Sequence, residues 1–264
     1  MKNNTTTNID TLRSSLSDKS VQVIDTRRET DYKMDHIQNA INLPLAEILK
    51  NDDPQKIGNI LTKLGISNES PITVYDDTFG ALASRIAWTL EYLGYDSVSL
   101  LDVTYSRWKN MKLEMSSEET KVKPTEPISL NLRKEILATI EQVDTDKENE
   151  DTVLIDNRER LNYLEQHIPG AINIPYRMLA TLDNILKSPA EMTKLFESRG
   201  IKKKSKLITY CGSVGTLSGL AYYALKTIEH PNVKLYVRSF KEWKETKRPT
   251  EKQQDANYWD LSAE

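Results

Sequence analysis

The sequence has little cysteine and histidine and no long apolar segment. Its 264 residues include one cysteine and three histidines, and aromatic residues make up 7%. One cysteine excludes an internal disulfide, and three histidines without cysteine partners do not predict a zinc site. No segment is apolar for long enough to cross a bilayer, and the polar beginning lacks the apolar stretch of a secretory signal. We therefore expect no membrane partner and a location in the reducing cytoplasm.

The charge of the chain is nearly balanced. The sequence contains 36 basic and 39 acidic residues, which leaves a net charge of -3. This balance gives no electrostatic reason to expect a nucleic-acid partner. With 264 residues, 38% of them hydrophobic, the chain is long enough for two modest cores, so we expect two domains.

An internal repeat organises the chain. Residues 23–27, Val-Ile-Asp-Thr-Arg, recur as Leu-Ile-Asp-Asn-Arg at an offset of 131, and further along the offset becomes 135. Repetition at a fixed offset over this length indicates a duplicated domain. A polar segment containing prolines separates the copies, as is typical of linkers. The predicted organisation is a first domain at 1–118, a linker at 119–127 and a second domain at 128–264.

Each copy alternates short β-prone runs with helical patterns. Strands alternating with helices predict a parallel sheet flanked by helices on both faces, which is an α/β fold. Ligands of such sheets gather at the carboxyl ends of the strands. The predicted strands are residues 22–25, 72–75 and 98–101 in the first copy, and 153–156, 207–210 and 233–236 in the second.

The only cysteine, Cys211, directly follows the last residue of a predicted strand. Small residues come next, followed by an amphipathic helical pattern from residue 217 to 228. Backbone N–H groups of such a turn can converge on one point, and the helix N-terminus adds partial positive charge. This setting favours the thiolate, which is the nucleophilic form. The alternative is a buried structural cysteine, against which the small neighbouring residues count. In the first copy Asp76 holds the equivalent position, so this copy has no sulfur nucleophile there.

Several segments follow a known pattern: residues 155–158, residues 167–175, the Cys211 loop, and residues 232–236 with Trp243. Together with the repeat, they resemble the tandem-domain rhodanese family, the thiosulfate and 3-mercaptopyruvate sulfurtransferases. The resemblance covers residues 11–243. It implies two tandem rhodanese-like domains, the first inactive and the second catalytic. It also implies transfer of a sulfane sulfur from a small donor, thiosulfate or 3-mercaptopyruvate, through a Cys211 persulfide. The acceptor would be a thiol, cyanide or a thioredoxin-like protein, and neither a metal nor an organic cofactor is needed.

The resemblance also implies a role for the loop after Cys211. Its backbone N–H groups would bind the persulfide anion, and two hydroxyl groups would be further donors. The loop is uncharged, as in the 3-mercaptopyruvate type, although its Val-Gly order reverses the usual Gly-Val order. The loop residues are Gly212, Ser213, Val214, Gly215 and Thr216, of which Ser213 and Thr216 carry the hydroxyls.

Three arginines are candidates for binding the donor. Arg158 matches a family arginine that can bind a carboxylate or sulfonate, but Arg27 holds its place in the copy without cysteine, so a structural role stays equally open. Arg160 lies near the place of the family's second substrate arginine, which here is Asn162. Arg238 could add positive charge at the pocket mouth, and the alternative is an arginine in solvent.

Two other functions compete with a sulfurtransferase. A rhodanese-related phosphatase needs an arginine six residues after the cysteine, and Leu217 stands there instead, which disfavours phosphoryl transfer. A sulfur-carrier or regulatory binding module would need the persulfide but no pocket for a small donor, and this alternative stays open.

Overall fold

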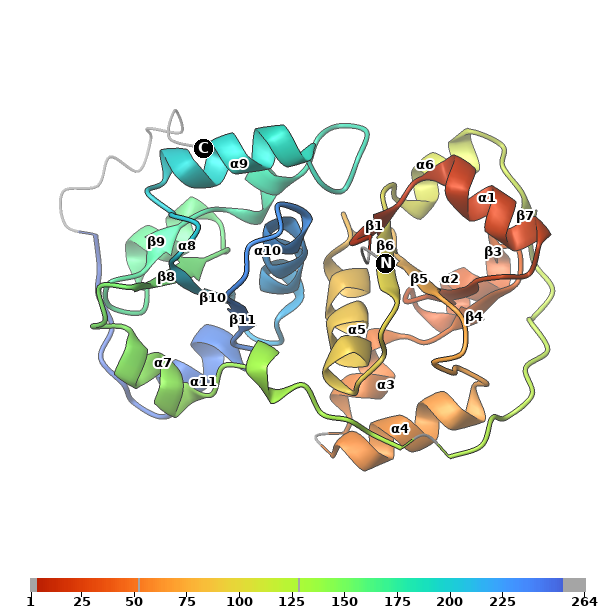
Figure 1. Ribbon diagram of the computed structural model, residues 1–264, viewed down its shortest axis with the longest axis horizontal. Coiled ribbons are helices and arrows are strands. Elements are labelled where there is room, and N and C mark those ends of the chain that lie inside the picture. Colours follow the sequence, from red (N-terminus) through yellow and green to blue (C-terminus); the bar gives the residue numbers. More distant parts are fainter. Residues whose placement is uncertain (1–3, 52, 128, 254–264) are drawn as a thin grey trace. The chain divides into compact units, whose positions relative to one another are not determined.

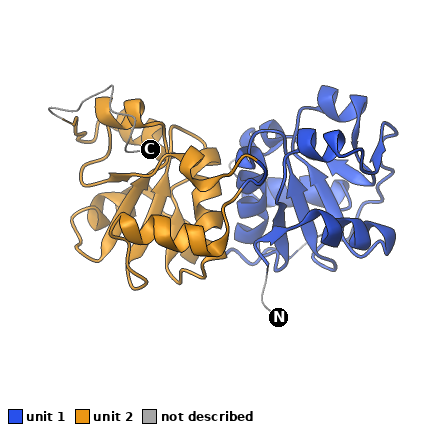
Figure 2. Cartoon of the chain, turned by 90° about the horizontal axis from the view of Figure 1, so that it is seen from above, with its two compact units in different colours: residues 1–134, 183–185 blue, residues 135–182, 186–264 orange. Residues whose placement is uncertain are grey.

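The chain folds into two compact units, which Figure 2 colours separately. The computed structural model describes residues 4–51, 53–127 and 129–253. Unit 1 comprises residues 1–134 and 183–185, and unit 2 comprises residues 135–182 and 186–264.

The division between the units falls later than the sequence predicts. The N–H of Thr125 donates to the carbonyl of Thr62, and the N–H of Asn131 donates to the carbonyl of Leu93. These bonds attach the end of the predicted linker, and the residues after it, to unit 1. Unit 2 therefore begins at residue 135 rather than at 128. Residues 254–264 of the predicted second domain lie outside the described residues.

Unit 1 is built on a five-stranded parallel sheet (Figure 1). The strand order is β1 (Thr6–Thr7), β6 (Val98–Leu101), β5 (Ile72–Tyr75), β2 (Gln22–Asp25) and β4 (Ala40–Asn42). A short antiparallel pair joins β3 (His36–Ile37) to β7 (Met115–Ser116). The helices are α1 (Ile9–Ser17), α2 (Glu29–Met34), α3 (Leu45–Leu49), α4 (Pro54–Lys63), α5 (Ala81–Tyr92) and α6 (Tyr105–Asn110).

Unit 2 repeats this plan with a four-stranded parallel sheet. The strand order is β11 (Val233–Leu235), β10 (Lys206–Tyr210), β8 (Thr152–Asp156) and β9 (Ile172–Asn173). The helices are α7 (Ile140–Asp146), α8 (Arg160–Glu165), α9 (Pro189–Ser198), α10 (Thr216–Thr227) and α11 (Ser239–Glu245), with 3₁₀ turns at Lys134–Ile136 and Tyr176–Leu179.

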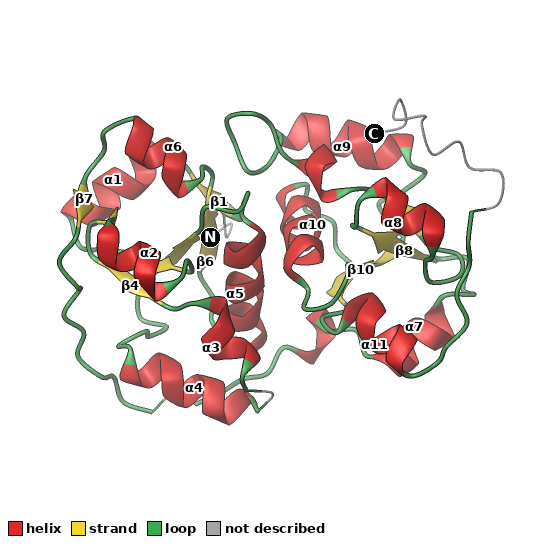
Figure 3. Ribbon diagram, turned by 180° about the vertical axis from the view of Figure 1, so that it is seen from behind, coloured by secondary structure: helices red, strands yellow, loops and turns green. Residues whose placement is uncertain are grey.

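Helices cover both faces of each sheet (Figure 3). In unit 2, α10 packs on β10 and β11, and eight of its twelve residues are buried. The opposite face contributes to a cluster in which Val143 of α7 and Trp243 of α11 pack against strand residues. Because both faces are covered, the strands carry apolar residues on both sides, as buried parallel strands do. The predicted α/β fold, with a parallel sheet flanked by helices in each domain, is confirmed.

Candidate active site

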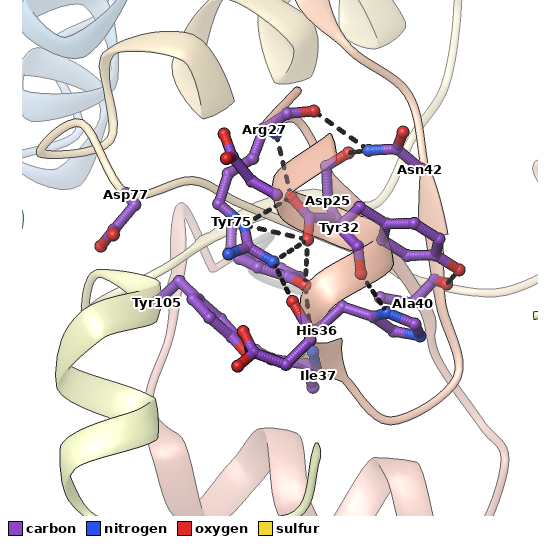
Figure 4. Close-up of polar contacts among 12 residues, drawn as sticks. Asp25, Arg27, Tyr32, His36, Ile37, Ala40, Asn42, Tyr75, Asp77 and Tyr105 are labelled. Atoms are coloured by element: carbon purple, nitrogen blue, oxygen red, sulfur yellow. Dashed lines mark hydrogen bonds and ion pairs between the residues drawn. The ribbon is translucent and has the colours of Figure 1, made fainter. Parts of the chain in front are cut away.

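The carboxyl ends of β2 and β8 carry the same polar framework. In unit 1 the Asp25 carboxylate accepts hydrogen bonds from Arg27 Nε (3.1 Å) and Nη2 (2.6 Å), and from the hydroxyl of Tyr75 (2.6 Å), as Figure 4 shows. In unit 2 Arg158 makes the same bonds to Asp156, with Nη2 at 2.6 Å. The sequence repeat is therefore also a repeat of hydrogen bonds.

The guanidinium of Arg158 is held on three sides. Besides Asp156, Nη2 donates to the carbonyl of Gln166 (2.6 Å), and the ring of Phe240 lies 4.1 Å from Cζ. Nη1 has no hydrogen-bond partner among the described residues. Burial lowers the pKa of this guanidinium, but the hydrogen bonds and charge of Asp156 outweigh it, so that the pKa lies above its usual value.

His36 and His167 occupy equivalent positions in the two copies, and a backbone carbonyl oxygen lies beside the Nδ1 atom of each ring. His36 Nδ1 lies 2.8 Å from the carbonyl oxygen of Tyr32, and its ring stacks on the Tyr32 ring at 3.8 Å. His167 repeats both contacts with Tyr163, at 2.7 and 3.9 Å. These contacts attach the residues that follow α2 and α8 to the helix before them. Among the described residues, no group of three or more His, Cys, Asp and Glu side chains could hold a metal ion.

Asp76 shows what the loop between strand and helix can bind. Its buried carboxylate accepts four backbone N–H groups and one hydroxyl. Oδ1 accepts from the N–H groups of Thr78 (2.9 Å) and Gly80 (2.8 Å), and Oδ2 accepts from those of Leu82 (2.7 Å) and Ala83 (3.0 Å) and from the Thr78 hydroxyl (2.8 Å). The loop of unit 1 is thus an anion-binding cradle, and the chain's own carboxylate fills it.

Cys211 occupies the matching position in unit 2. It follows β10 directly, as Asp76 follows β5, and its residue is only 2% exposed. Each loop ends at a glycine in the left-handed region that caps the next helix, Gly80 at φ 81° and Gly215 at φ 75°. Both loops therefore enter the helix in the same way, since glycine adopts this conformation without steric cost.

A pocket of about 680 Å³ opens beside the Cys211 loop. Gly212 of the loop and Leu217 of α10 line it, together with Arg158 and Phe240. Its charged lining residues are mixed in sign, since Lys241 and Lys244 line it with Arg158 and with Glu159, Glu165 and Glu245. Unit 1 has a pocket of about 640 Å³ at the equivalent place. Its lining residues Arg27, Asp77, Tyr105 and Lys109 correspond, in this order, to Arg158, Gly212, Phe240 and Lys244 of unit 2.

The structure does not bring all three candidate arginines to this pocket. Arg158 lines it, whereas Arg160, the first residue of α8, and Arg238 are absent from its lining. The Arg238 side chain is 61% exposed and lies 3.7 Å from Glu242. The cations that do join Arg158 are Lys241 and Lys244. Sequence reasoning missed them, although their spacing of three residues places them on one face of a helix.

Sequence reasoning also missed Ser239. Its hydroxyl oxygen accepts the Cys211 N–H (3.1 Å) and lies 3.8 Å from Sγ. The same hydroxyl donates to the carbonyl of Tyr236 (2.8 Å). The contact joins residues 28 positions apart, so no local pattern of sequence around Cys211 signals it.

A family model for the rhodanese-like domain matches this chain twice, at residues 8–111 and 139–246. A thiosulfate sulfurtransferase of Rattus norvegicus is 26% identical over 235 residues, which cover 81% of this chain and 78% of the relative. A 3-mercaptopyruvate sulfurtransferase of Escherichia coli is 25% identical over 265 residues, which cover 89% and 92%.

Solved structures give the same picture of the fold. The crystal structure of the 3-mercaptopyruvate sulfotransferase SseA from Escherichia coli superposes with a TM-score of 0.80 at 24% identity, over 88% of this chain and 97% of that one. Within the described ranges, no helix is long and apolar enough to cross a membrane.

Proposed function

The chain belongs to the family of rhodanese-like domains, and from this premise we propose that it is a sulfurtransferase that carries sulfur as a persulfide on Cys211. The family match covers both units, and the relatives described above are named after thiosulfate and 3-mercaptopyruvate. The second unit is the catalytic one in this proposal. The first unit is inactive because Asp76 has no sulfur to carry.

The observation that carries the proposal is the filled cradle of unit 1. At the offset of 135 residues, the N–H donors that bind Asp76 correspond to those of Ser213, Gly215, Leu217 and Ser218. A carboxylate oxygen lies two bonds beyond Cβ, and so does the outer sulfur of a persulfide, whose S–S bond is about 2.05 Å. The same N–H groups therefore suit the anionic outer sulfur on Cys211. The loop from Gly212 to Thr216 and the first turn of α10 form the cradle, to which the hydroxyls of Ser213 and Thr216 are added.

The reaction has two steps. The Cys211 thiolate attacks the outer sulfur of the donor, an S–S bond forms, and the donor fragment leaves with the electron pair of the broken bond. This fragment is sulfite from thiosulfate, or the enolate of pyruvate from 3-mercaptopyruvate. A nucleophilic acceptor, such as a thiol, cyanide or a thioredoxin-like protein, then takes the outer sulfur and Cys211 leaves as thiolate. Neither step requires a cofactor.

The pocket beside the loop supplies the donor site. In Arg158, Nε and Nη2 bind Asp156, which leaves Nη1 available to donate to an anionic group of the sulfur donor. Lys241 and Lys244 add positive charge on the same lining. Roles for Arg160 and Arg238 stay predictions, as does the cytoplasmic location, where reduced thiols are available as acceptors.

Mass spectrometry of the intact protein tests the proposal. After incubation with thiosulfate or, separately, 3-mercaptopyruvate, the wild type should gain about 32 Da, one sulfur atom, and the Cys211→Ser variant should gain nothing. Addition of a thiol should remove the sulfur and regenerate the original mass. A sulfur carrier without small-donor turnover would take no sulfur from either donor. An adduct that persists in Cys211→Ser would contradict the proposal.

A further inference from the structure

Ser239 lies against Cys211 in a backbone conformation that serine rarely adopts. Its φ is +58°, in the left-handed region, and the residue is fully buried. Its hydroxyl oxygen accepts the Cys211 N–H, donates to the carbonyl of Tyr236, and lies 3.8 Å from Sγ. A non-glycine residue in this region is strained, and such strain persists only where surrounding contacts impose it.

The duplicated unit shows what this position does without a cysteine beside it. At the offset of 135 residues Ser239 corresponds to Thr104, whose φ is −72°. Thr104 caps α6, since its hydroxyl accepts the N–H of Arg107 (3.3 Å). In unit 2 the N-cap of α11 is Arg238, which makes no side-chain cap bond. The N-terminus of α11 therefore has no side-chain cap bond, which is normally a stabilising contact, and the serine hydroxyl contacts Cys211 instead.

Two parts of the site can act on two different sulfur atoms. The loop N–H groups suit the outer sulfur, as the carboxylate of Asp76 indicates in unit 1. The Ser239 hydroxyl is close to the inner sulfur, Sγ. Sγ is negatively charged before the donor reacts and again when the acceptor removes the outer sulfur, but it is neutral within the persulfide. A donor aimed at Sγ therefore stabilises the attacking and leaving thiolate rather than the persulfide.

We propose that Ser239 is a positioning residue that fixes the backbone of Cys211 and shares its hydroxyl proton between the Tyr236 carbonyl and Sγ; this rests on the proposed function. In the persulfide the proton is donated to the Tyr236 carbonyl. When the acceptor attacks, the S–S bond breaks, its electron pair moves to Sγ, and the Ser239 hydroxyl turns toward that charge. No proton leaves the serine in this step.

Glycine and alanine at position 239 separate this role from a structural one. Ser239→Gly removes the hydroxyl but suits a φ of +58°, whereas Ser239→Ala removes the hydroxyl and keeps the strain. We expect Ser239→Gly to melt at a higher temperature than Ser239→Ala. Both should react alike: the pH at which Cys211 is alkylated by iodoacetamide at half its maximal rate should rise by about one unit. Sulfur transfer from the loaded enzyme to a thiol should slow by about tenfold.

Thr104→Ala is the matched control, because it removes the equivalent hydroxyl from unit 1. It should lower stability and leave both the alkylation profile and the transfer rate of Cys211 unchanged. An alkylation profile of Ser239→Gly that coincides with the wild-type profile would overturn the inference. The alkylation measurement does not require a persulfide, so it decides the role of Ser239 even if the wild type takes up no sulfur. Failure of the proposed function would appear separately, as a missing mass gain in the wild type.

Discussion

Replacing Asp76 with asparagine should destabilise unit 1 strongly, although the two side chains have nearly the same shape. Each carboxylate oxygen of Asp76 accepts two backbone N–H groups: Oδ1 those of Thr78 and Gly80, and Oδ2 those of Leu82 and Ala83. An asparagine amide nitrogen cannot accept a hydrogen bond. In either orientation of the amide, two N–H groups lose their acceptor and face an NH₂ group instead.

The size of the effect follows from the burial of those donors. In each pair one N–H is buried and the other is partly buried. A buried donor without a partner costs about 1–3 kcal/mol, and a partly buried donor costs less because water can reach it. We therefore expect Asp76→Asn to lower the free energy of unfolding of unit 1 by about 2–4 kcal/mol. The rotatable hydroxyl of Thr78 can adapt to either orientation and adds little.

Native-state hydrogen exchange measured by NMR can follow unit 1 separately from unit 2. The amides of Leu82 and Ala83 should exchange faster in Asp76→Asn, and the slowest amides of β5 should report the lower global stability. Asp77→Asn is the control, since Asp77 is exposed and accepts from the N–H and hydroxyl of Ser106. A change of less than about 0.5 kcal/mol in Asp76→Asn, the range of ordinary surface substitutions, would refute the view that the loop requires an anion.

Two further predictions concern unit 2. Arg158→Lys should destabilise unit 2 by about 1–3 kcal/mol, because lysine keeps the charge but cannot make the paired hydrogen bonds to the fully buried Asp156, and it should slow sulfur uptake from thiosulfate about tenfold in stopped-flow measurements. Arg27→Lys should destabilise unit 1 similarly without changing uptake, and equal uptake defects in both variants would contradict a donor-binding role. The pKa of His230 lies below its usual 6.5, because the effect of burial is larger than the opposing effect of the hydrogen bond to the Lys202 carbonyl. As the pH falls, the unfolded chain therefore binds a proton at His230 before the folded chain does. The stability that comes from keeping this buried imidazole neutral is fully present above pH 6.5, and it is lost as the pH falls through the lower pKa of the folded state. In urea titrations at a series of pH values, His230→Gln should reduce the decrease in the free energy of unfolding below pH 6.5. An equal decrease in the variant and the wild type would exclude His230 as its source.

Much of each sheet could be predicted from the sequence because the central strands are rich in apolar and β-branched residues. The predicted strands 22–25, 72–75 and 98–101 coincide with β2, β5 and β6. In unit 2 the ends of the strands differ from the prediction by one residue. The edge strands β1, β4 and β9 were missed. They contain two or three residues each, which is too short for a periodic pattern to distinguish them from loops.

The sequence by itself determined the duplication, the family and the position of the cysteine at the end of a strand, because these follow from local patterns and from their repetition. Tertiary structure alone decided which side chains meet there. It brought Ser239 to Cys211 and placed Lys241 and Lys244 on the pocket lining, whereas Arg160 and Arg238 do not line it. It also resolved how Asp76 fits its loop, with four N–H groups around one carboxylate. The physical reason is that hydrogen-bond geometry depends on how separate strands and helices pack, and residue spacing along the chain does not contain that information.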